Sequence, residues 1–161
     1  FIDELTFTNF IKEIKNFKSQ KEYDSWHYSV IENMRKKSDD LQLLLEKHNK
    51  NYEDYSYGIA AKLLNCYLKV FFLEYFGKEK FADFIHPPID RLLLLALQEE
   101  DPKLFNFNND VFVSVKYPKI PVWTKINANE YTSIINLINE FILSRGQKGL
   151  WRSEAFWRGH Q

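Results

Sequence analysis

The chain has 161 residues, 45% of them hydrophobic, and its 22 basic and 22 acidic residues give a formal net charge of zero. The aromatic-rich composition, with 14 Phe, 9 Tyr and 4 Trp, excludes a disordered chain, which needs low hydrophobicity and a high net charge. Zero net charge also excludes attraction of nucleic acid or an anionic membrane by the whole molecule, so any such binding must rest on a local patch.

A single cysteine, Cys66, excludes an intramolecular disulfide and a cysteine-based zinc cluster. One cysteine in an apolar run is typical of a reducing compartment, and we predict a cytoplasmic location. No stretch approaches the roughly 18 apolar residues that span a bilayer. Residues 1–5 lack the basic and apolar regions of a signal peptide. We therefore expect a soluble protein without membrane contact.

Apolar residues at helical spacing predict three helices in the first third of the chain. The first covers about residues 8–17. A second is expected to begin with Asp24 as its cap and to end in the basic run before Ser38, where the helix dipole favours cations. Ser38 is a natural N-cap for the third helix, which extends to His48.

The central segment 56–76 predicts a helix that is apolar on nearly every side, as expected for a helix surrounded by others. Gly77 follows in the usual position after a helix. The sequence His86-Pro87-Pro88 comes next, and Pro88 suits the first turn of a helix that ends near Gln98.

The pattern then changes, because valines at every second position over 111–115 have the period of a strand. Prolines interrupt it before 122–126, which predicts a small hairpin or an extended arm at an edge. Helical spacing returns over 131–142, and a last short helix carries Trp151 and Trp157. The predicted fold class is mainly α: a single-domain helical bundle with a small β hairpin, covering residues 1–161.

Common catalytic and metal motifs are absent from the sequence. Five glycines leave no Gly-rich phosphate loop, and neither an HExxH motif nor an EF-hand loop occurs. The four histidines lie on different segments without metal-ligand spacing, so we predict neither a metal site nor a cofactor. Cys66 lies within an apolar helix and is expected to be an inert buried thiol.

Three polar residues interrupt the apolar central helix. Lys62, Asn65 and Lys69 are spaced i, i+3 and i+7, which places them on one stripe. One interpretation is a solvent-facing side along which the lysine stems lie. The other is a polar groove in which two ammonium groups and an amide meet an anion or a partner.

The proline-fixed junction that follows is a second candidate. A helix N-terminus is a ready anion site, to which Arg91 would add a bidentate fork. Alternatively, Asp90 caps the helix while Arg91 pairs with Glu74 or Asp83. His86, positioned by the prolines, is the first candidate for acid–base catalysis, with Asp90 orienting it.

Basic and aromatic residues interleave near the C-terminus, around Arg152 and Trp157. Such a run stacks on and neutralises nucleic acid in some proteins. In others the tryptophans close a core and the arginines are solvated around it.

The segments 57–69 and 85–94, with Trp123-Thr124 further on, resemble a group of small helical bacterial proteins without an established activity. That group shares a GxAxKxxNxYLK helix, an HPPIDRxLL junction and a later Trp-Thr. The resemblance implies a helical fold and no particular reaction. It singles out Lys62, Asn65, His86, Asp90, Arg91 and Trp123.

The leading hypothesis is a non-enzymatic binding or interaction module with a local anion site. A phosphate-bearing ligand or a nucleic-acid backbone would engage Lys62, Lys69 and Arg91 together. The first alternative is an enzyme acting on nucleotides or nucleic acid, with His86 as acid or base. The second is an oligomerising structural protein, in which aromatics such as Trp123 lie at an interface between copies of the chain.

Overall fold

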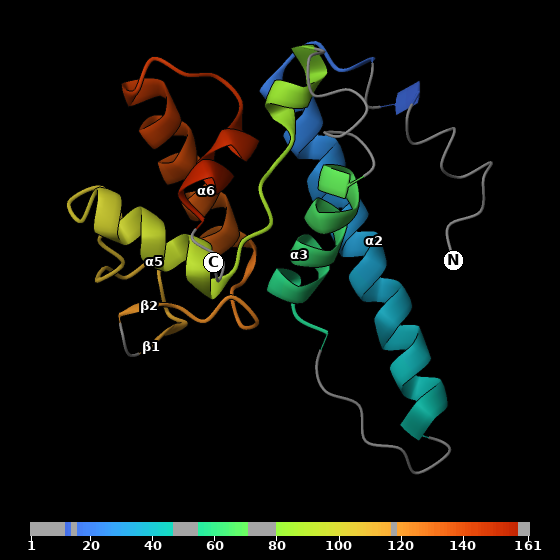
Figure 1. Cartoon of the computed structure of the whole chain (residues 1–161). Coiled ribbons are helices and arrows are strands. Elements are labelled where there is room, and N and C mark those ends of the chain that lie inside the picture. Colours follow the sequence, from blue (N-terminus) through green and yellow to red (C-terminus); the bar gives the residue numbers. More distant parts are fainter. Residues whose placement is uncertain (1–11, 14–15, 47–54, 71–79, 117–118, 158–161) are drawn as a thin grey trace.

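The computed structural model describes residues 12–13, 16–46, 55–70, 80–116 and 119–157, most of them helical (Figure 1). The α-helices are α2 (Gln20–Glu46), α3 (Tyr57–Leu68), α5 (Arg91–Glu100) and α6 (Ala128–Ser144). Two 3-10 helices, η2 (Lys80–Phe84) and η3 (Leu150–Phe156), lie between and after them. Strands β1 (Val115–Lys116) and β2 (Ile120–Pro121) complete the fold. The predicted fold class, mainly α with a small hairpin, is confirmed.

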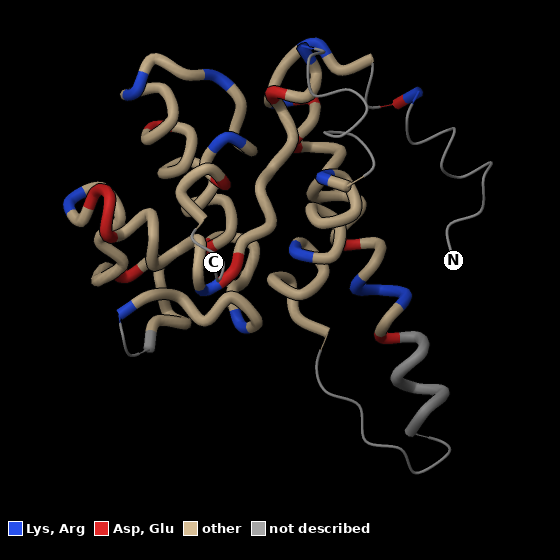
Figure 2. The backbone as a smooth tube through the Cα atoms, in the orientation of Figure 1, with Lys and Arg blue, Asp and Glu red and all other residues tan. Residues whose placement is uncertain are grey.

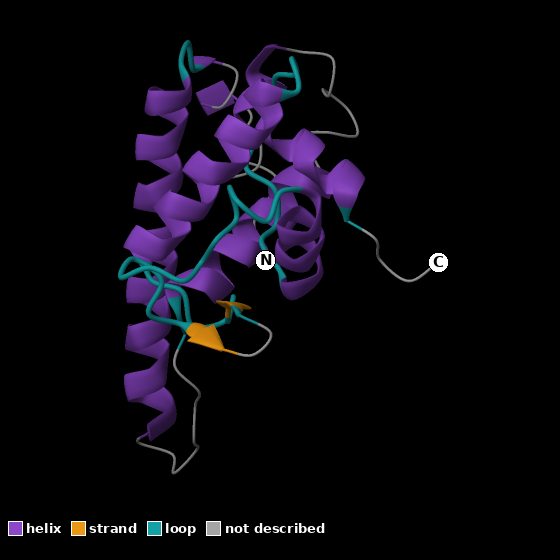
Figure 3. Ribbon diagram, turned by 90° about the vertical axis from the view of Figure 1, so that its left-hand side faces the viewer, coloured by secondary structure: helices purple, strands orange, loops and turns teal. Residues whose placement is uncertain are grey.

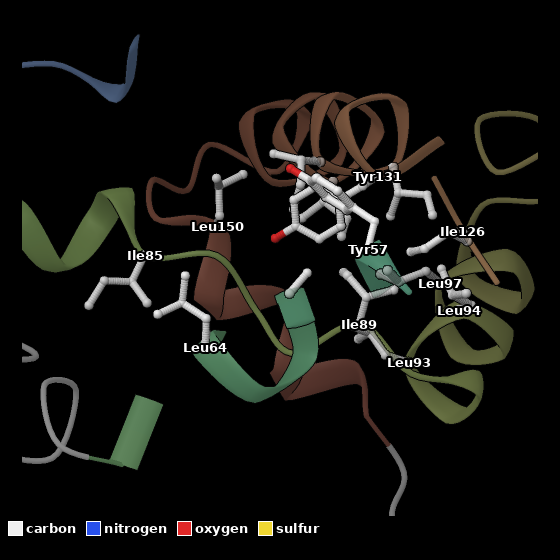
Figure 4. Packing of buried hydrophobic residues seen from close by; sticks show 14 of the residues in the cluster. Tyr57, Leu64, Ile85, Ile89, Leu93, Leu94, Leu97, Ile126, Tyr131 and Leu150 are labelled. Atoms are coloured by element: carbon white, nitrogen blue, oxygen red, sulfur yellow. The ribbon is translucent and has the colours of Figure 1, made fainter. Parts of the chain in front are cut away.

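The helices form two groups that pack against each other. α2 and α3 lie side by side, and α5, α6 and η3 form the other group (Figure 1). Figure 4 shows side chains of α3, α5, α6 and the segment before α5 meeting between these elements. The Tyr57 and Tyr131 rings, 5.5 Å apart, join α3 to α6 within this core. None of the helices in the described part of the chain is both long and apolar enough to cross a bilayer.

α2 corrects the prediction of two separate helices around residues 24–48. It begins at Gln20 and continues without a break to Glu46, so that Asp24 and Ser38 are interior residues and not caps. The Oγ of Ser19 accepts the Glu22 N–H at the real start. A polar residue such as Ser38 does not interrupt a helix that contains neither Gly nor Pro. The helix predicted over 8–17 lies almost entirely outside the described residues.

α3 begins where the sequence predicts, because Ser56 caps it and its side chain accepts the Ile59 N–H. A π-helical turn follows at Lys69, whose N–H reaches the carbonyl oxygens of both Asn65 and Cys66. Such turns often mark functional positions in helices. The predicted continuation to residue 76 and its stop at Gly77 lie outside the described residues.

The hairpin is shorter than the alternating valines predict. β1 and β2 have two residues each and pair antiparallel, with Val115 opposite Pro121. Val113 lies outside the strand, with 75% of its surface exposed. Glu130 holds the hairpin to α6, because its side chain accepts the Ser114 N–H and also completes the capping box with Asn127. The strands therefore lie at one edge of the helices (Figure 3).

Gly58 sets the distance between α3 and the loop that precedes α6. Its N–H donates to the carbonyl oxygen of Ile126, and a Cβ at this position would lie 1.8 Å from the carbonyl oxygen of Trp123. No side chain fits in that space, so glycine allows the two backbones to approach. The contact also places Trp123 beside the next turn of α3.

Replacing Gly58 by alanine is expected to destabilise the fold by about 2–3 kcal/mol, because the new Cβ must push two backbones apart. Urea denaturation followed by circular dichroism measures the change. Gly146→Ala is the matched control, since nothing lies within 4 Å of its Cβ position and its φ of 67° alone opposes the change. The free energy of unfolding of the control should fall by about 1 kcal/mol. Equal losses in both variants would contradict the close approach at Gly58.

Candidate functional site

Asn65, predicted for a solvent-facing stripe or a polar groove, is fully buried instead. Its Nδ2 donates to the carbonyl oxygen of Pro87 and to the hydroxyl of Tyr131, both at 2.9 Å. Its Oδ1 lies 2.7 Å from Nε2 of His27. One amide therefore joins α2, α3, α6 and the segment that carries the proline pair.

The hydrogen-bond partners of Asn65 determine where the neighbouring protons lie. The Pro87 carbonyl can only accept, so the amide nitrogen faces it and Oδ1 faces His27. Nε2 of His27 must then carry a proton. Tyr131 accepts from Asn65, which leaves its own hydroxyl proton for Nδ1 of His86, 3.0 Å away.

The hydrogen bonds continue in the same donor-to-acceptor direction from Tyr131 through His86 towards the surface. Because its Nδ1 accepts from Tyr131, its proton is on Nε2, which lies 3.0 Å from Oδ1 of Asp24. Gln20 donates to that carboxylate oxygen at 2.8 Å and to the Phe84 carbonyl at 3.0 Å. We call the series His27, Asn65, Tyr131, His86 and Asp24 the buried hydrogen-bond chain.

The predicted pairing of His86 with Asp90 is therefore corrected. His86 is fully buried, both of its ring nitrogens have partners, and its carboxylate partner is Asp24. Asp90 instead caps α5, where its Oδ1 accepts the Leu93 N–H at 2.9 Å. The arrangement leaves no ring nitrogen of His86 available to a substrate.

Burial controls ionisation along the chain. It lowers the pKa of His86, although Asp24 opposes the change, and it lowers the pKa of His27 further. Nδ1 of His27 is buried and has no hydrogen-bond partner in the described part of the chain, so a second ring proton would have no acceptor there. Burial also raises the pKa of Tyr131, which keeps its hydroxyl protonated. Both histidines are thus held neutral.

The two lysines of the predicted stripe lie apart from this chain, and each has a carboxylate partner. Nζ of Lys62 lies 3.5 Å from Oδ2 of Asp90 and 4.2 Å from the centre of the Trp123 ring. Lys69 pairs with Oε2 of Glu154 on η3. Both lysines therefore have carboxylate partners within the protein, which neither interpretation of the stripe included.

Glu154 is the acidic residue that the sequence did not single out. Burial raises the pKa of its carboxyl group, while Lys69 opposes this change. Its other oxygen, Oε1, is buried and has no hydrogen-bond partner among the described residues. The only sequence signal was its place in the interleaved basic and aromatic run, which gives no indication of a contact with α3.

Two cavities lie between α3 and η3, and together we call them the α3–η3 groove. The smaller cavity, about 280 Å³, contains the two ion pairs, with Cys66, Pro88 and Trp157 among its other lining residues. The larger, about 590 Å³, adds Gln147, Trp151, Arg152 and Ala155. Lys69, Val70 and Glu154 line both cavities, which makes them parts of one groove.

The remaining predicted residues take different places. Arg91 is exposed, and its side chain makes no hydrogen bond or ion pair with the described residues, Asp83 included; Glu74 lies outside them. Cys66 is half-buried and not fully buried as predicted, and burial raises the pKa of its thiol. Within the described ranges, no group of His, Cys, Asp and Glu side chains could hold a metal ion.

Comparison with known proteins gave no match to a protein-family model, a curated protein or a solved structure.

Replacing Asn65 by alanine is expected to cost about 3 kcal/mol of stability, because it removes three buried hydrogen bonds and leaves the His27 N–H and the Pro87 carbonyl unpaired. Denaturant titration measures the loss. Asn139→Ala, on the exposed side of α6, should change stability by less than about 0.5 kcal/mol. Matching values for the two variants would refute a structural role for Asn65.

Because His27 and His86 are buried, we expect acid to lower the stability of the folded protein. Both pKa values are lowered in the folded state, so the unfolded chain takes up protons first. Their contribution is unchanged above about pH 7 and falls below about pH 6.5, by up to about 1.4 kcal/mol per pH unit for each histidine. Urea denaturation between pH 7.5 and 5 measures this slope. His27→Gln should make it shallower, and an unchanged slope in that variant would contradict the assignment.

Proposed function

We propose that this chain is a non-enzymatic binding module that holds a small anionic ligand, such as a phosphate-bearing molecule, in the α3–η3 groove. The observation that carries the proposal is that three cationic side chains, Lys62, Lys69 and Arg152, line the two cavities that share Lys69. Each lysine uses one of its three donors on a carboxylate, which leaves others for a ligand.

Exposure supports access to these cations. The Lys62 side chain is 27% exposed and that of Lys69 is 45% exposed. The Arg152 guanidinium lies over the Trp151 ring, 4.7 Å from its centre, and Nε donates to the Lys148 carbonyl. Arg152 therefore has further N–H donors, and it forms no ion pair with a carboxylate of the described residues.

The groove favours binding over catalysis. A catalytic nucleophile requires an adjacent base or a lowered pKa. Cys66 has a raised pKa, and none of the described residues that line the groove is a histidine. His86, the leading catalytic candidate, is enclosed in the buried hydrogen-bond chain.

The charge distribution favours a small ligand over a nucleic-acid backbone. Figure 2 shows acidic and basic residues interspersed along the described backbone. A nucleic-acid backbone requires several cations along its length, whereas a single anionic group needs only two or three donors. Asp90 and Glu154 also limit the attraction for a highly charged polymer.

Calorimetric titration with inorganic pyrophosphate is expected to show binding that weakens as salt is raised. Arg152→Gln should reduce affinity about tenfold, because a hydrogen bond to a charged group is lost. This variant is preferred to Lys69→Gln, since it leaves no carboxylate unpaired. Lys103→Gln, at an exposed site after α5, is the matched control and should bind as the unaltered protein does.

A parallel titration with single-stranded RNA distinguishes the two anion sources. RNA binding that exceeds pyrophosphate binding would replace the small ligand by nucleic acid. Absence of binding to either, or equal binding by the Arg152 and Lys103 variants, would overturn the proposed site.

A further inference from the structure

The α3–η3 groove contains charges of both signs in one cavity. Lys62 with Asp90 and Lys69 with Glu154 form two ion pairs that line the same space of about 280 Å³. The carboxylates are the less exposed partners, at 19% for Asp90 and 16% for Glu154. The groove therefore presents an alternating set of donors and acceptors and not a purely cationic surface.

A ligand with only a negative charge binds through the donors that each lysine keeps free, but it also lies beside the like charges of Asp90 and Glu154. To take full advantage of a lysine, it must draw that lysine away from its carboxylate. The carboxylate would then be left unpaired in a mostly buried position, which is strongly unfavourable. A ligand that carries a cation as well lowers this cost, because its cation replaces Lys69 beside Glu154 while its anion engages the lysines, and Asp90 keeps its contact with Lys62.

Glu154 provides an acceptor for such a cation. Oε2 is paired with Lys69, whereas Oε1 has no partner among the described residues. Oε1 has almost no solvent-accessible surface, so a ligand N–H in the groove donates to Oε2 and shares it with Lys69. The lysine that pairs with this carboxylate, Lys69, lies at the π-helical turn after α3.

The larger cavity supplies room for an apolar group next to the charges. It adjoins the Lys69–Glu154 pair and is lined by Val70, Ala155 and the Trp151 ring. Its volume of about 590 Å³ falls within the range of small-molecule sites. An apolar substituent that extends from the charged part of a ligand would enter this space.

We propose that the ligand is a zwitterion with an apolar substituent, of the α-amino acid type. Its ammonium group donates to Glu154, its carboxylate accepts from Lys69 and Lys62, and its side chain occupies the larger cavity. This inference rests on the proposed function and specifies the chemistry of the same site.

The test compares phenylalanine with N-acetylphenylalanine, which lacks the cation, and phenylalanine amide, which lacks the anion. Calorimetric titration is expected to show that phenylalanine binds about tenfold more tightly than either analogue, since each analogue forfeits one charged hydrogen bond. The dipeptide Phe-Phe, whose charges are farther apart, separates a free amino acid from a short peptide and should bind more weakly than phenylalanine.

Glu154→Gln is expected to reduce phenylalanine affinity about tenfold and to leave N-acetylphenylalanine affinity unchanged or increased. Glu99→Gln, exposed on α5, is the matched control and should change neither. Thermal melting of both variants verifies that they are folded. A uniform loss for all three compounds would show that Glu154 only supports the groove's structure, and would overturn its role as the ammonium acceptor.

The outcomes separate this inference from the proposed function. If N-acetylphenylalanine or pyrophosphate binds as tightly as phenylalanine, the zwitterion is overturned while the anion site stands. If phenylalanine amide binds most tightly, or if none of these compounds and no pyrophosphate binds, both proposals are overturned.

Discussion

The constraint on which this structure depends is that the amide of Asn65 lies where no water reaches it. Every polar atom of such a group needs a protein partner, since leaving one unmet costs about 1–3 kcal/mol. The three partners belong to α2, to α6 and to the proline-fixed segment before α5. The positions of these elements around α3 thus follow from satisfying one side chain. The proline pair contributes by holding the Pro87 carbonyl in place.

This constraint also explains which polar residues have structural roles. Asn65 and His86 are occupied by the fold, and Asp90 caps α5 while it neutralises Lys62. The space proposed for a ligand, between α3 and η3, is one where Lys62 and Lys69 are already paired with carboxylates. Under the proposed function, a ligand would have to exchange contacts with these paired charges, in addition to being attracted by the lysines.

The sequence predicted the kinds of elements better than the contacts between them. Helical period and caps were sufficient for the start of α3 at Ser56, whereas α5 begins at Arg91 and Pro88 lies before the helix, not in its first turn as predicted. Spacing placed Lys62 and Asn65 on one stripe, but a stripe does not reveal which of its edges turns inward. The partners of Asn65 are as much as 66 residues away, and no local pattern reports such a pairing. The continuity of α2 was missed because Ser38 resembles a cap.

The close approach at Gly58 limits which sequence changes the protein can accept at this position. The first turn of α3 and the loop before α6 are separated by more than sixty residues in the chain, yet they share a space too narrow for a single methyl group. An insertion or deletion in that loop would shift the Trp123 carbonyl and release the restriction on position 58. A side chain at position 58 is therefore compatible only with a loop that holds the Trp123 carbonyl farther from α3.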